Sequence, residues 1–277
     1  MTSAQIEIPP PSLDDVLFER RGTTGYITLN RPVVLNAINW SIMRRLMAGL
    51  ERAEADDEVK VVVLTSNGRA FSAGGDIQST PPTDDLPTPN AMEIYMKIWR
   101  MAKPVIAAVR GYALGQGCEL AGICDLTVAA DDAVFGEVQI RHGFSPPILI
   151  TPFLVGMKQA KEILMLGERI SAADALRLGM VNRVVPGEDL MATVEDMATK
   201  MAALPQTPMR SNKQLVNRVY ELAGFQDAIN YRDDPLMAAM LAGGGDLDPH
   251  LKVLRAQGWE AFRSSRDVLY KAEDQRP

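Results

Sequence analysis

The sequence predicts an α/β protein, because almost wholly apolar, strand-like runs alternate with helical segments through its first half. Three such runs, Lys60–Thr65, Val105–Val109 and Leu126–Ala129, have the composition of strands that are covered on both faces. Helices are expected at about Ala91–Met101 and Gly115–Ile123. Strands joined through helices in this way run parallel and are connected by right-handed crossovers.

The segment before these strands is expected to form a hairpin and a helix. Val16–Arg20 and Gly25–Leu29 flank a turn-prone Gly-Thr-Thr sequence, which is typical of two antiparallel strands. Asn39 is a suitable N-cap for a helix that ends near Asp56. The apolar residues of this helix recur at the spacing i, i+3, i+4 and i+7: Met43, Leu46, Met47 and Leu50.

The second half is expected to hold one more short strand and then helices to its end. Ser171 with Asp174 resembles a capping box, and Gly179 is a suitable C-cap for the same helix. A strand at Val181–Val185 follows. We place a soft boundary near Leu204, beyond which the pattern is helical.

The chain is therefore divided into three parts. Residues 1–14 are predicted to be a flexible leader, residues 15–204 the α/β core, and residues 205–277 a helical C-terminal region. Within the core, the proline- and aspartate-rich stretch Ser79–Asn90 is predicted to be an exposed loop. In the C-terminal region, three large apolar side chains indicate either a subunit contact or packing on the chain's own core: Trp259, Phe262 and Leu269.

Composition and charge exclude several classes of protein. The 29 basic and 35 acidic side chains give a net charge of −6, which lacks the basic excess of a nucleic-acid-binding protein. Two cysteines and two histidines are too few for a disulfide framework or a His/Cys zinc site. No run reaches the ~20 apolar residues that a membrane-spanning helix needs. We expect no nucleic-acid, membrane or metal partner, and a reducing compartment, the cytoplasm.

Two known sequence motifs, the dinucleotide-binding fingerprint and the serine-hydrolase pattern, each lack one required glycine in this chain. The pair Gly115 and Gly117 follows a strand and opens a helix, but the third glycine of a dinucleotide fingerprint would fall on Leu120. The segment 70–74 differs from the G-x-S-x-G pattern of serine hydrolases because Ala70 stands in place of the first glycine. We therefore interpret Ser72 as a loop or packing serine.

Two glycine-rich turns after buried strands remain, Gly68–Ile77 and Gly111–Leu120. The plain interpretation is that tight turns need positive φ angles. A functional interpretation is also available, since small residues let the backbone approach a ligand closely. A helix that starts near Gly115 also directs unpaired N–H groups at whatever lies before it. Two such turns side by side would hold one oxyanion.

Together with other segments, these turns resemble the enoyl-CoA hydratase/isomerase (crotonase) superfamily. The matching segments are ITLNRP at 27–32 with Asn36-Ala37, AFSAGGDI at 70–77, KPVIAAVRGYALGQGCELAGICDLTVAA at 103–130, AVFG at 133–136 and SAADALRLGMVNRVVP at 171–186. In order and spacing they cover roughly Val16–Pro205. The resemblance implies a spiral of ββα turns, with a C-terminal helical region through which the chain forms a homotrimer or hexamer.

The resemblance also implies acyl-CoA thioester substrates, with coenzyme A as part of the substrate and no separate cofactor. The shared chemistry is stabilisation of a thioester enolate by two backbone N–H groups, which by motif are those of Gly75 and Gln116. Glu119 matches the first catalytic carboxylate, which moves a proton at the α and β carbons. Without the resemblance it is a first-turn glutamate that offsets the helix dipole. The residues expected to line the substrate are Ala73, Gly74, Asp76, Ile77, Gly115 and His142.

The chain departs from the superfamily at three places. Members usually carry glycine or alanine at the position of Gln116, so its side chain would narrow the pocket. The second catalytic carboxylate is replaced by Gln139, which cannot exchange a proton at neutral pH. The loop Arg141–Pro147 is shorter and would bring His142 to the acyl end, unless this is only a packing histidine. Glu137 shares strand parity with Gln139 and would substitute for it only if the register slips.

Three functions follow from this pattern. The first, which we carry forward, is hydration, dehydration or double-bond isomerisation of an enoyl-CoA. In it Glu119 acts alone, with Gln139 orienting water, or with His142 completing the pair. The second is a catalytically impaired member that only binds acyl-CoA. The third is a C–C bond hydrolase of β-diketone type with the same oxyanion hole.

Overall fold

The computed structural model describes residues 11–77, 79, 82, 84–230, 252–253, 256–258, 260–262, 264 and 270. Most of the predicted leader, and both Trp259 and Leu269, lie outside the described residues. In the described part of the chain, no helix combines the length and the apolar character needed to cross a bilayer.

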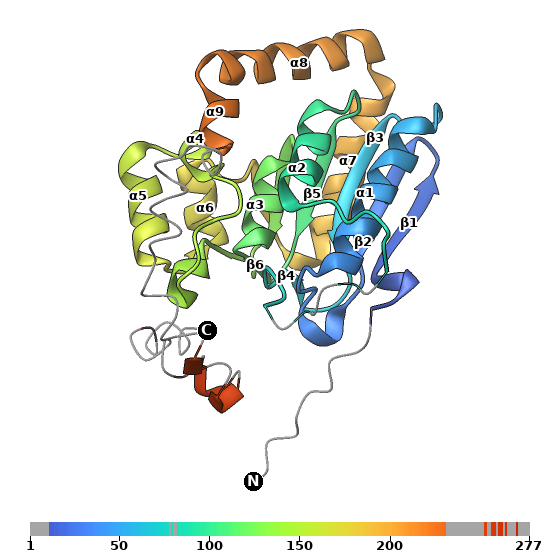
Figure 1. Ribbon diagram of the computed structural model, residues 1–277. Helices are drawn as coiled ribbons and strands as arrows, with labels where there is room; N and C mark the ends of the chain where they lie inside the picture. Colours follow the sequence, from blue (N-terminus) through green and yellow to red (C-terminus); the bar gives the residue numbers. More distant parts are fainter. Residues whose placement is uncertain are drawn as a thin grey trace.

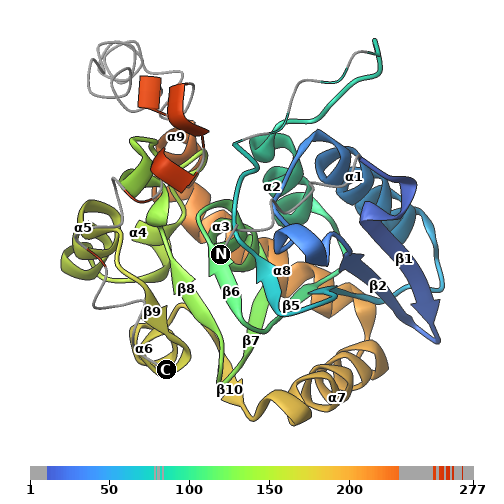
Figure 2. The same ribbon diagram turned by 90° about the horizontal axis from the view of Figure 1, so that it is seen from below.

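The centre of the fold is a six-stranded sheet in the order β1-β2-β3-β5-β7-β10 (Figures 1 and 2). The first two strands form the predicted antiparallel hairpin, and the remaining neighbours pair in parallel. The strands are β1 (Val16–Arg21), β2 (Thr24–Leu29), β3 (Val61–Ser66), β5 (Val105–Val109), β7 (Leu126–Ala130) and β10 (Arg183–Val185). The three predicted buried strands are confirmed, and the last strand is two residues shorter than expected.

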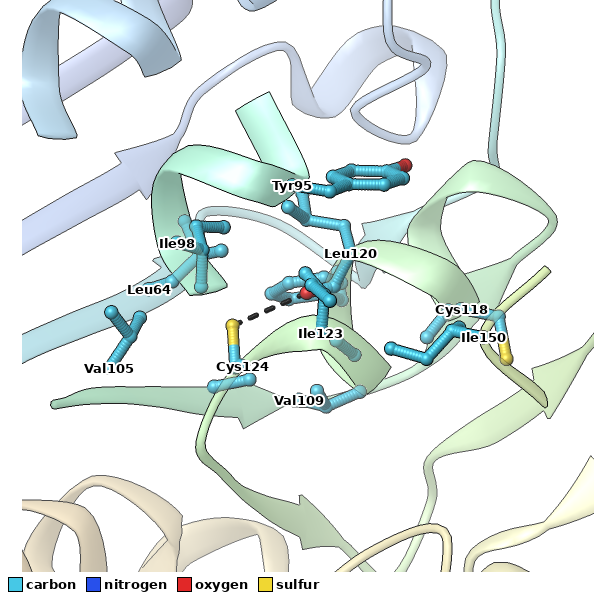
Figure 3. Close-up of a cluster of buried hydrophobic side chains, with 14 of the residues drawn as sticks. Leu64, Tyr95, Ile98, Val105, Val109, Cys118, Leu120, Ile123, Cys124 and Ile150 are labelled. Atoms are coloured by element: carbon cyan, nitrogen blue, oxygen red, sulfur yellow. Dashed lines mark hydrogen bonds between the residues drawn. The ribbon is translucent and has the colours of Figure 1, made fainter. Parts of the chain in front are cut away.

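The two faces of this sheet belong to different cores, as the run of valines in β3 shows. Val62 and Leu64 pack with α1 (Trp40–Ala55), α2 (Ala91–Arg100) and α3 (Gln116–Ile123). The alternate residues Val61 and Val63 pack on the other face, against α7 (Leu190–Ala203). Figure 3 shows the first cluster, in which side chains from β3, β5, α2 and α3 meet. Full burial of such a side chain contributes roughly 1.5–3 kcal/mol.

A second, four-stranded sheet was not predicted. Its order is β4-β6-β8-β9, from β4 (Ala70–Ser72), β6 (Tyr112–Leu114), β8 (Val134–Gly136) and β9 (Ile170–Ser171). Each of β4, β6 and β8 follows a strand of the large sheet within a few residues, so the chain winds as a spiral of ββα turns (Figure 2). This confirms the predicted architecture. The two glycine-rich turns are extensions of neighbouring strands in this small sheet.

The predicted helix caps at Asn39 and Ser171 each accept a hydrogen bond from the backbone. Asn39 accepts a hydrogen bond from the Ile42 N–H at the start of α1. Ser171 accepts from the Asp174 N–H, but its own hydroxyl donates to the Asp174 carboxylate, so the reciprocal half of the capping box is missing. Further helices are α4 (Thr151–Leu154), α5 (Met157–Leu166), α6 (Ala172–Leu178), which Ser171 caps, α8 (Gln206–Leu222) and α9 (Phe225–Ile229).

The chain turns at Pro205, and α8 then spans the outside of the molecule (Figure 1). Lys213 ties α8 to the core, because its ammonium group lies 2.8 Å from the Asp125 carboxylate and donates to the Ile98 carbonyl. The division of the chain near residue 204 stays a prediction.

Candidate active site

The two glycine-rich turns lie side by side because β4 and β6 pair in parallel. A Cβ atom built on Gly74 would lie 2.7 Å from the Leu114 carbonyl oxygen and 3.7 Å from the Gln116 nitrogen. One built on Gly117 would lie 2.6 Å from the Ser72 carbonyl oxygen. The turns therefore approach each other so closely that these positions have no room for a side chain, and Gly74 also has a φ of +99°.

Where the two turns meet, the amide groups of Gly75 and Gln116 have no acceptor among the described residues. The amides on both sides of Gly75 are paired: the Gly74 N–H donates to Ser72 Oγ, and the Asp76 N–H to the Ile38 carbonyl. Gly75 is the bridge residue opposite Ile38, so its own N–H faces away from that pairing. Gln116 is the first residue of α3, where an N–H has no intrahelical partner.

Buried polar groups hold the first turn in place. Ser72 is fully buried, and its hydroxyl donates to the Asn36 carbonyl at 2.8 Å while accepting from the Gly74 N–H. Ser72 is therefore a packing residue, as interpreted. Asp76 lies 3.2 Å from the buried guanidinium group of Arg31, so its carboxylate anchors the turn.

The side chain of Gln116 lies over Gly75. Its Oε1 atom is 3.1 Å from the position of a Cβ built on Gly75. The Tyr95 hydroxyl of α2 donates to the Gln116 carbonyl at 3.0 Å. The departure at position 116 therefore leaves the amide in place and fills part of the space beside it.

Glu119 is fully buried in α3, three residues after Gln116 and on the same side of the helix. One carboxylate oxygen lies 3.5 Å from the Tyr95 hydroxyl and the other 3.5 Å from Gln139 Nε2. Burial, followed by the charge of Glu119, raises the pKa of Tyr95 well above its usual range, so Tyr95 remains a neutral donor. The structure thus brings together Glu119 and Gln139, the two side chains that the sequence resemblance predicts for the carboxylate positions.

Glu137 lies next to Gln139 without any slip of register. The strand parity assumed from the sequence is wrong here, because β8 ends at Gly136 and a 3-10 turn, Val138–His142, begins at once. Glu137 is 2% exposed, and Gln139 Nε2 donates to it at 2.7 Å. The Thr151 hydroxyl donates to its other oxygen at 2.8 Å. Burial nevertheless raises the pKa of Glu137 to about 7.

The other predicted lining residues are placed as follows. Ala73 and Ile77 flank Gly75 in the first turn, and Gly115 precedes Gln116 with a φ of +50°. His142 is half-buried, with its ring centroid 5.7 Å from that of Phe262. This contact favours the packing interpretation of both residues, with Phe262 fully buried on its own chain.

Two surface hollows lie apart from this cluster. One is lined by residues of α1, α2 and α9, and the other lies beneath α8. Neither is lined by Gly75, Gln116 or Glu119.

Sequence reasoning did not single out Tyr95 or Thr151. Tyr95 belongs to an amphipathic helix and Thr151 to the start of α4, and neither lies in a motif. Their contacts depend on how α2 and α4 pack beside α3. No signal within a single sequence would have identified them.

Comparisons with known proteins agree on one family. A family model described as enoyl-CoA hydratase/isomerase matches residues 19–234. A probable enoyl-CoA hydratase of Mycobacterium tuberculosis is 36% identical over 213 residues, which are 75% of this chain and 83% of that protein. A short-chain-enoyl-CoA hydratase of Clostridium acetobutylicum is 36% identical over 214 residues, or 74% and 82% of the two chains.

Solved structures give the same result. The crystal structure of an enoyl-CoA hydratase/isomerase from Xanthobacter autotrophicus Py2 matches with a TM-score of 0.84 and 36% identity. The match covers 92% of this chain and 97% of that one. A monofunctional enoyl CoA isomerase from M. smegmatis matches with a TM-score of 0.63 and 32% identity, over 73% of this chain and 91% of that one.

Proposed function

The chain belongs to the enoyl-CoA hydratase/isomerase family, and from this premise we propose that it transforms an enoyl-CoA through a thioester enolate held in a backbone oxyanion hole. Membership makes it an enzyme of the hydratase/isomerase class that acts on acyl-CoA. One observation carries the finer proposal: the amides of Gly75 and Gln116, where the two turns meet, lack an acceptor among the described residues, whereas those of Gly74, Asp76 and Gly115 are paired.

In the proposed site, both amides donate to the thioester carbonyl oxygen. Negative charge develops on this oxygen as the enolate forms, so donors fixed in advance stabilise the transition state more than the substrate. The first turn of α3 adds the favourable end of its helix dipole. Losing one such donor typically costs about 2.7–4 kcal/mol of transition-state stabilisation.

Glu119 is the proposed acid and base. Because it lies one turn after Gln116, its carboxylate and the Gln116 amide face the same ligand. A single carboxylate can take a proton from one atom and return it to another, which serves both isomerisation and hydration. The Tyr95 hydroxyl lies 3.5 Å from one oxygen of this carboxylate, and Gln139 Nε2 lies 3.5 Å from the other. Coenzyme A enters as part of the substrate, with no separate cofactor in the proposal.

The test compares Glu119→Gln with a matched variant, Glu93→Gln. Glu93 is also a first-turn glutamate, but it is exposed and caps α2, so it controls for an effect on a helix dipole. Crotonyl-CoA turnover should fall about 10²- to 10⁴-fold in Glu119→Gln and stay unchanged in Glu93→Gln. Binding of acetoacetyl-CoA, measured by calorimetry, should persist in both. Undiminished turnover of Glu119→Gln would remove Glu119 from the mechanism.

The same assays separate the two alternative functions. A member that only binds would show tight acetoacetyl-CoA binding and no turnover across a panel of enoyl-CoA substrates. A C–C bond hydrolase would cleave a β-diketone that carries no coenzyme A. Either result with the wild-type chain would displace the proposal.

We also propose that the chain assembles as a homotrimer or hexamer through its helical C-terminal region. Four apolar side chains of α8 support this, since each is more than half exposed: Leu215, Val216, Val219 and Leu222. Light scattering after gel filtration should give three or six times the 30.3 kDa chain mass. A monomer at micromolar concentration would contradict it.

A further inference from the structure

The mechanism proposed so far makes no use of the buried carboxyl group of Glu137. Its carboxylate is held from two sides, by the Thr151 hydroxyl at 2.8 Å and by Gln139 Nε2 at 2.7 Å. It lies between β8 and the 3-10 turn, one residue beyond Gly136, whose carbonyl accepts from the Gly115 N–H. Glu137 is therefore joined to the oxyanion turn through the backbone and to Glu119 through Gln139.

The contacts of Gln139 fix the direction of its amide. Its Nε2 atom lies 2.7 Å from Glu137 Oε2 and 3.5 Å from Glu119 Oε1, and ionised carboxylates only accept hydrogen bonds. The NH₂ group must therefore face the two carboxylates. The carbonyl oxygen of Gln139, Oε1, then points away from the carboxylates of Glu119 and Glu137.

The Oε1 atom of Gln139 is buried and finds no hydrogen-bond partner among the described residues. It lies 3.2 Å from the position of a Cβ built on Gly115, the residue directly before the proposed donor Gln116. A buried acceptor without a partner costs free energy, so such a group in a site points to a donor that arrives with the ligand.

We propose that Glu137 is a positioning residue, which orients the Gln139 amide so that its carbonyl oxygen accepts a hydrogen bond from the water that adds to the substrate. The inference rests on the proposed function and commits it to hydration. One hydrogen of the water is held by Gln139 Oε1, while the other is taken by Glu119 as the oxygen bonds to the β carbon. The electron pair of the double bond moves to the thioester oxygen, and Glu119 then delivers its proton to the α carbon.

The protonation state of Glu137 decides this orientation. When Glu137 is protonated, its O–H can donate to the Gln139 carbonyl, and the amide then turns its NH₂ group toward Gly115. The other titratable groups near the Glu137 carboxylate and the Gln139 amide include Glu119, Tyr95 and Cys118. Burial raises the pKa of Tyr95 and of the Cys118 thiol well above their usual ranges, so neither titrates near neutrality. On the 3-10 turn itself, Arg141 donates to the Gly167 carbonyl and stacks on Tyr270, and the His142 ring packs against Phe262 with centroids 5.7 Å apart.

The test measures hydration of crotonyl-CoA against pH in the wild type, Glu137→Gln and Thr151→Val. Activity of the wild type should fall as the pH drops through about 7, the pKa of Glu137. Glu137→Gln should lose this acidic limb and reduce kcat roughly 10- to 100-fold with little change in KM, because its amide no longer dictates the direction of Gln139. Thr151→Val removes a hydrogen bond that lowers the pKa of Glu137, so the limb should move to higher pH.

The outcomes separate this inference from the proposed function. If the wild type turns over no enoyl-CoA, the proposed function fails. If it hydrates crotonyl-CoA but Glu137→Gln keeps both kcat and the acidic limb, only the role of Glu137 fails. Isomerisation without formation of a 3-hydroxyacyl product would also overturn it. Should Glu137→Gln not fold, as judged by circular dichroism, an unmoved limb in folded Thr151→Val would contradict the inference.

Discussion

The two walls of the proposed site are built in different ways. The backbone wall consists of the turns at 72–77 and 114–117, and its working groups are main-chain amides. The side-chain wall consists of Glu119, Glu137 and Gln139, whose working groups are carboxylates and an amide. Main-chain groups keep their places when a side chain changes, so the backbone wall accepts Gln116. The chemistry of the side-chain wall changes with each residue, as Gln139 beside Glu137 illustrates.

The largest effect on kcat is expected from a substitution that forces the two turns of the backbone wall apart. Gly74→Ala puts a methyl group 2.7 Å from the Leu114 carbonyl at a φ of +99°, so the two turns must move apart. Displacing one oxyanion donor should lower kcat about 10²- to 10³-fold. The control is Gly224→Ala, which has a similar φ of +90° but open space around the new methyl group. Equal activity of the two variants would contradict the role of the backbone wall.

In the side-chain wall, the buried Glu137 is expected to change how the free energy of unfolding depends on pH. Glu137 has its pKa raised from 4.5 to about 7 in the folded chain. At a pH below the pKa of Glu137 in the unfolded chain, the folded and the unfolded state both hold the proton, so the free energy of unfolding is unaffected. As the pH rises through this window the unfolded chain ionises first, and folding is penalised by about 3 kcal/mol above pH 7. Denaturant unfolding of the wild type and Glu137→Gln should therefore diverge with pH in favour of the variant, whereas parallel profiles would contradict the buried carboxylate.

A smaller effect is expected from Tyr95, which contacts both walls. Tyr95→Phe removes the hydrogen bond to the Gln116 carbonyl and the contact with Glu119, while the ring keeps its packing in α2. One lost hydrogen bond corresponds to about 0.5–1.5 kcal/mol, or up to about tenfold in kcat/KM. Steady-state kinetics on crotonyl-CoA would measure it. A loss as large as that of Glu119→Gln would place Tyr95 among the proton-transfer groups.

The smallest effect is expected from Gln116→Ala, because the donor is a main-chain group. The variant removes the carboxamide that lies over Gly75 and leaves the amide where it is. We expect kcat to stay within about threefold and KM for crotonyl-CoA to fall, since the space beside Gly75 opens. A large fall in kcat would show that the Gln116 side chain takes part in the reaction.

The large sheet and its helices could be predicted from the sequence, because their signals are local. The valine run of β3 and the caps Asn39 and Gly179 each leave a pattern within a few residues. The small sheet could not, since strands of two or three residues are too short to show a period.

The structure confirms that the two glycine-rich turns lie side by side, although nothing in the sequence showed that they touch. Their role as the backbone wall of a site stays a prediction. The side-chain wall was predicted less well. Glu137 was assigned to a strand, whereas the 3-10 turn at Val138–His142 places it against Gln139. Its other partner, Thr151, comes from α4, and such a contact exists only after folding. Side-chain networks of this kind depend on packing, which a single sequence does not record.

The central claim is that two main-chain amides polarise one thioester carbonyl. Infrared difference spectroscopy with crotonyl-CoA labelled with ¹³C at the thioester carbonyl tests it directly, in Glu119→Gln so that the ligand is not consumed. The carbonyl stretch should move to lower frequency on binding than in water, and the shift should shrink when Gly74→Ala is added. An unshifted stretch in a complex shown to be saturated would contradict the claim.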